Sequence, residues 1–134
     1  MPQPLRGVLA IAHTPLTDAD TIDAAALKRS IDWAFAVGAD GIGTGMVSET
    51  LKLTHDERLA LPKMLVEFAA GRGPVFVSVA AEGTWLAHGY AAVAEKAGCD
   101  AIMAVPPLTA KLPEQGMFDH FRAIADAVSI PIIV

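Results

Sequence analysis

The residues with the clearest potential for chemistry follow a glycine-rich stretch. Three alternating glycines at 41–45 lead directly into the segment Met46–Glu49. Because glycine has no side chain, such a stretch lets a ligand or another backbone segment approach closely. It fits neither the P-loop spacing G-x-x-x-x-G-K-[ST] nor G-x-G-x-x-G, since Ser48 stands where the third glycine is required. The stretch is therefore a candidate ligand-binding turn that differs from the common nucleotide-binding loops.

A few other polar residues have both a chemical and a structural interpretation. His13 is expected at the end of the first strand, where it would contact a substrate, bind a metal with Glu49, or make a structural hydrogen bond. The structural alternative for Glu49 is a buried carboxylate that fixes its loop through backbone amides. No third ligand with usable spacing accompanies the two, so no metal is expected. Cys99 lacks a histidine and acid with recognisable spacing, which favours a packed thiol over a nucleophile.

Short apolar segments alternate with amphipathic ones along the whole chain. The apolar segments predict strands buried on both faces, at 8–13, 41–44, 75–79, 101–105 and 130–134. Four apolar stripes with helical spacing lie between them: Leu27, Ile31, Ala34 and Phe35; Leu61, Met64, Leu65 and Phe68; Leu86, Tyr90, Val93 and Ala97; Met117, Phe121, Ile124, Ala125 and Val128. The alternating order predicts a parallel sheet with helices packed outside it. In such folds ligands bind at the carboxyl ends of the strands, which is where Met46–Glu49 falls.

An internal repeat supports the same βα unit. The segments Val37–Ile42 and Ala97–Ile102 lie 60 positions apart, which corresponds to two such units. In each copy a glycine is expected to end a helix with positive φ, and an aspartate precedes the next strand. The alternation suits either an open doubly wound sheet or a (β/α)8 barrel, and a whole barrel needs about 250 residues. The 134 residues would supply only its first half, and the uncapped last strand indicates the N-terminal part of a larger protein.

The polar run after the glycine-rich stretch has a structural explanation. Thr54 and Glu57 have the spacing of a capping box, in which each side chain bonds to the backbone N–H of the other residue. Asp56 and Glu57 also suit the positive end of a helix dipole. These residues therefore predict a helix start.

Composition and charge exclude several classes of function. With 53% hydrophobic and 19% charged residues, the chain can form a core and is not disordered. A net charge of −5 provides no basic surface for nucleic acid. No apolar run reaches the ~20 residues of a membrane span, and residues 1–6 lack the pattern of a secretion signal. A single cysteine suits a reducing compartment, so a cytoplasmic location is expected.

Several motifs taken together resemble the dihydrodipicolinate synthase and N-acetylneuraminate lyase family. Residues 45–49 with 53–58 are similar to the family's second-strand signature. The similarity extends to four other segments in the expected order, which are 12–15, 36–41, 105–107 and 115–121. The resemblance implies an α/β fold, the (β/α)8 TIM barrel. Residues 1–134 would form the N-terminal portion of a single barrel domain, with strands 1 to 5 and helices 1 to 4.

The resemblance also implies a lyase or aldolase that forms or cleaves a carbon–carbon bond. Such enzymes form a Schiff base between a lysine and pyruvate or a related 2-keto acid, and the iminium then acts as an electron sink. That lysine is expected beyond Val134, so no catalytic residue lies within this segment. All five lysines present, Lys28, Lys52, Lys63, Lys96 and Lys111, are predicted to be solvated. No cofactor is expected, and the implied assembly is a homo-oligomer, either a dimer or a tetramer.

By the same resemblance, Met46, Val47, Ser48 and Thr109 would bind the substrate. Met46 and Val47 stand where the family commonly has two threonines, and Ser48 stands where it has a glycine. The threonine hydroxyl relay is therefore absent, while backbone amides remain to hold a keto-acid carboxylate. After the fourth strand, Leu108 and Thr109 replace a tyrosine pair, which places Thr109 near a subunit boundary.

Two other functions stay open on the sequence. A non-catalytic half-barrel would self-associate and bury its open sheet edges against a second copy. A metal-dependent lyase would use His13 and Glu49 as ligands.

Overall fold

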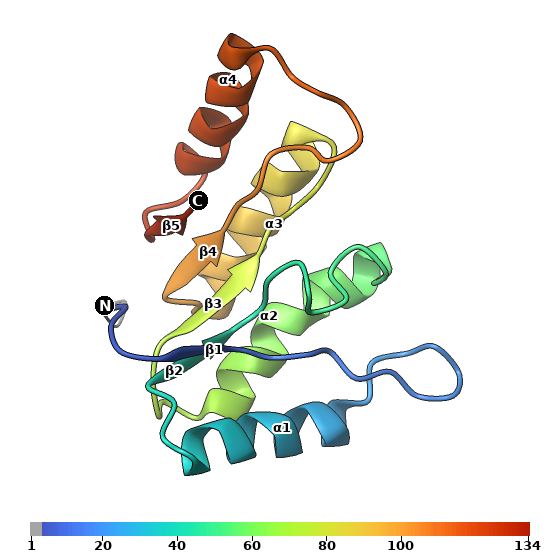
Figure 1. Cartoon of the computed structure of the whole chain (residues 1–134), viewed down its shortest axis with the longest axis vertical. Coiled ribbons are helices and arrows are strands. Elements are labelled where there is room, and N and C mark those ends of the chain that lie inside the picture. The colour runs from blue at the N-terminus through green and yellow to red at the C-terminus, as the bar shows by residue number, and fades with distance from the viewer. Residues whose placement is uncertain (1–3) are drawn as a thin grey trace.

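A single parallel sheet organises the chain in the computed structural model, which describes residues 4–134 (Figure 1). The five strands lie in the order β1-β2-β3-β4-β5 and all neighbours are parallel. Their bounds are β1 Leu9–Ile11, β2 Gly41–Gly43, β3 Val75–Ser78, β4 Ala101–Met103 and β5 Ile132–Ile133. The predicted alternation is confirmed, although each strand is shorter than its apolar segment. The expectation about a secretion signal depends partly on residues 1–3, which lie outside the described residues.

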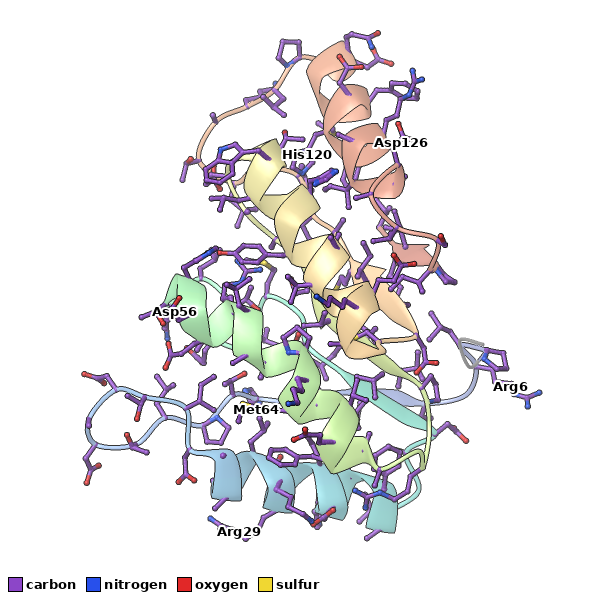
Figure 2. All side chains as sticks on the ribbon, turned by 180° about the vertical axis from the view of Figure 1, so that it is seen from behind. Arg6, Arg29, Asp56, Met64, His120 and Asp126 are labelled. Atoms are coloured by element: carbon purple, nitrogen blue, oxygen red, sulfur yellow. The ribbon has the colours of Figure 1, made fainter. Side chains whose placement is uncertain are left out.

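Four helices join the strands and cover one face of the sheet. They are α1 Ala24–Ala36, α2 His55–Ala69, α3 Thr84–Ala97 and α4 Glu114–Ala125. They follow one another from bottom to top in Figure 1, and Figure 2 shows α2 and α3 in front of the sheet, with α1 below it and α4 above it. An open doubly wound sheet has helices on both faces, whereas a (β/α)8 barrel has them only outside. The fold is therefore part of a (β/α)8 barrel. None of the helices described in residues 4–134 is long and apolar enough to cross a membrane.

The hydrophobic core lies between the sheet and the helices. Alternate strand residues such as Ile42, Val77 and Ile102 point toward the helices and are buried. They meet the buried side of the predicted helix stripes, including Leu27, Ile31, Leu61, Leu65, Ala91 and Ile124. Removing this apolar surface from water contributes roughly 25 cal/mol per Å². The core thus fixes which strand residues face the helices and which face the opposite side, called the inner face below.

Glycines on the inner face leave room for a phenylalanine. Gly43 pairs in register with Phe76 of the next strand. A Cβ added to Gly43 would lie 2.4 Å from two carbons of the Phe76 ring. The ring is 2% exposed, so the glycine backbone serves as the surface on which it packs. The glycine-rich stretch was predicted to allow a close approach. At Gly43 the group that approaches closely is the Phe76 ring of the same protein.

The internal repeat has a physical role at the opposite end of the strands. Gly38 and Gly98 take φ values of 103° and 93° after α1 and α3, as predicted. The Asp40 carboxylate accepts a hydrogen bond from the N–H of Val8 at 2.7 Å. The Asp100 carboxylate accepts one from the N–H of Val75 at 2.9 Å. Each aspartate thus joins the start of its own strand to the start of the preceding one.

The prediction that every strand is buried on both faces is wrong for the segments of β1 and β5. Val8 is 66% exposed, Ile11 is 39% exposed and Val134 is 83% exposed. The physical reason is position, because β1 and β5 are the edge strands of the described sheet and each has a neighbour on one side only. The stripe predicted for α4 is also partly wrong. Met117 and Ala125 are exposed, and Val128 follows the end of the helix.

Gly43→Ala tests the packing of the inner face. We expect the new methyl group to displace the Phe76 ring and lower the free energy of unfolding by about 1–3 kcal/mol. Urea unfolding monitored by circular dichroism measures this change. The control is Gly89→Ala, an exposed position inside α3 where an added Cβ meets nothing within 4 Å. That change should stabilise the protein by about 0.5–1 kcal/mol. Equal stability of Gly43→Ala and the parent would show that the ring does not need the glycine.

Candidate functional site

The carboxyl ends of all five strands meet at one edge of the sheet, called the mouth below. Parallel α/β folds bind ligands at this edge. The turn after β2 lies there and carries Met46, Val47 and Ser48. Met46 is half-buried, Val47 is 63% exposed and Ser48 is fully buried. The three predicted residues therefore share one turn but differ in their access to a ligand.

The Ser48 hydroxyl joins the turn to the end of β1. It donates to the carbonyl oxygen of Ala12 at 2.5 Å and accepts from the N–H of Gly45 at 3.0 Å. The Ser48 N–H in turn donates to the Gly45 carbonyl at 3.1 Å. Because the proton of this buried hydroxyl is already donated to Ala12, Ser48 holds the turn in place. Ser48 therefore belongs to the predicted pocket only through its position in the turn, because its hydroxyl has no free proton to donate to a ligand.

Two threonines on either side of Ser48 complete the support of the turn. Thr50 donates from Oγ1 to the carbonyl of Gly45 at 2.8 Å. Thr44 accepts at Oγ1 from the N–H of Ser78 on β3 at 3.0 Å. Both side chains are buried. Neither was predicted as a site residue, although small hydroxyl residues around a glycine turn commonly bond to nearby backbone.

Glu49 does not play the structural role expected for it. Its carboxylate is half-exposed and pairs with the ammonium group of Lys52, three residues later. Ser48 and Thr50 fix the loop instead, because their side chains are shorter than that of Glu49 and place their hydroxyl groups within hydrogen-bond distance of the backbone. Glu49 itself has φ of 62°, a conformation that residues other than glycine adopt at a cost. The anchored residues on both sides hold it there.

Four backbone donors of the turn have no partner within residues 4–134. The N–H groups of Gly45 and Ser48 are used inside the turn, whereas those of Met46, Val47, Glu49 and Thr50 donate to no described acceptor. Met46 and Val47 lie at the mouth, and Val47 is largely open to water. Successive unpaired N–H groups in a turn form a small site for an anion, independent of side-chain type. The N–H groups of Met46 and Val47 are therefore candidate donors to a carboxylate.

Thr109, the fourth predicted residue, lies in the loop after β4 and is exposed. Its N–H and its hydroxyl both donate to the carboxylate of Glu82, which follows β3. No hydrogen bond joins Thr109 to Met46–Ser48. Strands β2 and β4 are two positions apart, which corresponds to about 10 Å at the usual strand spacing. The structure thus places the predicted residues at one edge but in two separate groups.

Arg58 supports the mouth at the end of β3. Its guanidinium donates to the carbonyls of Ala80 at 2.5 Å and Ser78 at 3.1 Å, and its Cζ lies 4.0 Å from the Tyr90 ring centroid. Tyr90 is itself hydrogen bonded to Nδ1 of His55 at 3.0 Å. Burial lowers the pKa of Arg58, but an arginine stays protonated at neutral pH. The charge therefore stabilises two strand-end carbonyls that no sequence pattern pointed to.

The predicted capping box at the start of α2 is confirmed. The Glu57 carboxylate accepts from the N–H of Thr54 at 2.8 Å, and the Thr54 hydroxyl accepts from the N–H of Glu57 at 3.3 Å. Glu57 also accepts from the N–H of Ile22 at 3.2 Å, which joins the segment before α1 to α2. These bonds, chiefly those from Thr54, lower the pKa of the Glu57 carboxyl.

The remaining reactive side chains have mainly structural surroundings. Cys99 is buried, and burial raises the pKa of its thiol to about 12, which agrees with a packed thiol. His13 is exposed and makes no hydrogen bond within residues 4–134, so the structural hydrogen bond predicted for it is not found there. In that same range no group of three or more His, Cys, Asp or Glu side chains is arranged to hold a metal ion. All five lysines are exposed, as expected.

Ser48→Ala tests whether the hydroxyl holds the turn. The substitution leaves a buried carbonyl and a buried N–H without their partner, so the free energy of unfolding should fall by about 2 kcal/mol. Amide exchange at Gly45 should become faster at the same time. Ser30→Ala, on the exposed side of α1, is the matched control and should be neutral or slightly stabilising. An unchanged exchange rate at Gly45 would contradict the assigned role.

Comparison with known proteins agrees with the resemblance drawn from the motifs. Residues 4–134 match the Dihydrodipicolinate synthetase family. The chain is 37% identical over 129 residues to a 4-hydroxy-tetrahydrodipicolinate synthase of Acidiphilium cryptum (strain JF-5), covering 96% of this chain and 44% of that protein. It therefore spans less than half the length of this curated relative.

Solved structures share the fold. The 4-hydroxy-tetrahydrodipicolinate synthase of Methylacidiphilum fumariolicum SolV matches with a TM-score of 0.90 and 28% identity, covering 96% of this chain and 43% of that one. The chloride-inhibited dihydrodipicolinate synthase of Acinetobacter baumannii, complexed with pyruvate, matches with a TM-score of 0.88 and 26% identity, covering 98% and 45%. On the match over residues 4–134, the chain belongs to the dihydrodipicolinate synthetase family.

Proposed function

We propose that residues 1–134 are the N-terminal portion of a single (β/α)8 barrel domain with lyase activity. The reaction would form or cleave a carbon–carbon bond through a Schiff base between a lysine and pyruvate or a related 2-keto acid. Membership of the family supports this proposal, as do relatives named as synthases. The related structure from Acinetobacter baumannii, which is complexed with pyruvate, supports the ligand class.

The observation that carries the proposal is the pair of unpaired N–H groups at Met46 and Val47. A 2-keto acid presents a carboxylate that needs hydrogen-bond donors, and backbone donors fixed before binding require little reorganisation. Ser48 and Thr50 hold the turn that carries them. In the proposed site the side chains of Met46 and Val47 border the carboxylate and supply no hydroxyl group. Proton transfer would therefore have to use groups from elsewhere in the barrel.

The lysine of the proposed reaction lies outside the 134 residues. A Schiff-base lysine must be neutral to attack a carbonyl, and a desolvated pocket favours that form. Every lysine of this chain is exposed, and three of them, Lys28, Lys52 and Lys63, pair with carboxylates of nearby residues. The chain therefore contributes substrate binding, while the covalent chemistry belongs to residues that follow.

Reduction with borohydride in the presence of pyruvate tests the proposed chemistry. The 134-residue chain should give no covalent adduct, because it lacks a desolvated lysine. A polypeptide that continues this chain to the length of its relatives should trap one pyruvate per chain, seen by mass spectrometry. Lactate, which has no ketone, is the control ligand. Failure of the longer polypeptide to trap pyruvate would eliminate the Schiff-base mechanism.

We further propose that the protein is a homo-oligomer whose subunits meet near the mouth. Besides Val47, large apolar side chains exposed in this region are Leu51 at 55%, Trp85 at 75% and Leu108 at 56%. Exposed apolar groups that gather in one region commonly mark a contact surface. Thr109, next to Leu108, would then lie close to the boundary between subunits.

Sedimentation velocity checks this assembly. At tens of micromolar, we expect species heavier than the 14.0 kDa monomer, and a smaller proportion of them for Leu108→Ser. A protein that sediments as a monomer at every concentration would contradict the proposal. The same result would count against the self-associating half-barrel, which the exposed apolar residues also favour.

A further inference from the structure

A carboxylate outside the predicted site residues controls the loop after β4. Glu82 lies between β3 and α3, 26 residues before Leu108 and 27 residues before Thr109 in sequence. Its Oε1 accepts from the N–H of Leu108 at 2.7 Å. Its Oε2 accepts from the N–H of Thr109 at 3.1 Å and from the Thr109 hydroxyl at 2.5 Å. One side chain thus binds two consecutive residues of the neighbouring loop.

The loop has little other support. Residues 105–112 make no backbone-to-backbone hydrogen bond within the described part of the chain. Pro106 and Pro107 have no N–H to donate. At the start of the loop, buried His120 of α4 donates from Nε2 to the carbonyl of Val105 at 3.3 Å, and its Nδ1 is hydrogen bonded to the Thr84 hydroxyl at 2.9 Å. Figure 2 shows His120 between α3 and α4. Glu82, just before α3, and His120 of α4 therefore hold the loop at two places.

Three donors at this position require a group that only accepts. An ionised carboxylate has two accepting oxygens and no proton to place, whereas a glutamine amide has one accepting oxygen. The hydrogen bond from the Thr109 hydroxyl, followed by that from the Leu108 N–H, lowers the pKa of the Glu82 carboxyl. The arrangement therefore suits the charged form of Glu82 and no neutral replacement of similar shape.

The bond from the Thr109 hydroxyl determines what Thr109 can offer to a ligand. A hydroxyl has one proton and two lone pairs, and here the proton is donated to Glu82. Thr109 can then accept a hydrogen bond from a ligand but cannot donate one to a carboxylate. Met46 and Val47, on the β2 side of the mouth, offer backbone N–H donors that no described acceptor occupies. A carboxylate can thus be bonded at the β2 side, whereas the Thr109 hydroxyl has no free proton to donate to it.

We propose that Glu82 is a positioning residue of the candidate site. It holds the loop after β4 at the mouth and makes Thr109 an acceptor, so that a ligand's carboxylate is directed to the turn at Met46 and Val47. This assignment rests on the proposed function for its effect on the ligand. The contact between Glu82 and the loop can be tested without any ligand.

Amide exchange measured by NMR tests the contact in the free protein. In Glu82→Ala, exchange at Leu108 and Thr109 should be at least about tenfold faster, the size expected when a charge-assisted bond is lost. Glu82→Gln should give an intermediate rate, because one oxygen still accepts. The control Glu67→Gln removes the same charge from an exposed position on α2 and should leave both rates unchanged. Unchanged rates in Glu82→Ala would overturn the proposal.

A ligand arm tests the effect on hydrogen-bonding character. When Glu82 is present, the Thr109 hydroxyl donates its proton to Glu82 and does not offer it to the carboxylate. The Thr109→Val variant should therefore bind pyruvate with the same affinity as the parent protein. In Glu82→Ala the Thr109 hydroxyl proton is free to be donated to the carboxylate. Replacing Thr109 by valine in that variant should then lower the pyruvate affinity. A fall in affinity for Thr109→Val in the presence of Glu82 would contradict the assignment. Absence of pyruvate binding in the parent would count against the proposed function, and the exchange measurement would still decide whether Glu82 holds the loop.

Discussion

The buried hydroxyl of Ser48 is the contact on which the geometry of the mouth depends. It links the turn after β2 to the carbonyl of Ala12, directly after the neighbouring strand β1, across 36 residues of sequence. A buried hydroxyl that both donates and accepts contributes stability, whereas an unpaired one would cost about 1–3 kcal/mol. The turn needs such a link because it contains Glu49 with a positive φ and so cannot continue the regular ladder. Thr44 connects the same turn to β3, and Thr50 donates to the Gly45 carbonyl within the turn.

The inner face of the sheet depends on small residues in a related way. The Phe76 ring packs on the backbone of Gly43. An added Cβ at Gly45 would lie 3.5 Å from the sulfur of Met103 on β4. Met103 therefore reaches over β3 toward β2, which a flexible thioether side chain does readily. A Cβ at Gly45 would make only an ordinary contact, so it is Gly43 that packing below the turn requires, while the turn itself presents its backbone to the mouth. The two roles are separate although the residues are contiguous.

Much of the fold could be predicted because its signals are local or periodic. The alternation of apolar segments predicted a parallel sheet with the strands and helices in this order along the chain, the spacing of Thr54 and Glu57 predicted the start of α2, and the repeat predicted the glycine ends of α1 and α3. The candidate site was harder to predict, since its decisive contacts join residues far apart in sequence. The partners of Ser48, Arg58 and Glu82 lie 36, 20 to 22 and 26 to 27 residues away. Residue type suggested a polar turn, but only the folded chain shows that Glu49 faces Lys52 and that Ser48 faces Ala12.

The central claim is that the turn after β2 binds a keto-acid carboxylate through its backbone. A crystal structure of the protein with pyruvate tests this most directly. The account predicts carboxylate oxygens within hydrogen-bond distance of the amide nitrogens of Met46 and Val47, with Ser48 still bonded to the Ala12 carbonyl. Pyruvate bound to side-chain cations elsewhere, or a turn that releases Ser48 to contact the ligand, would contradict the account.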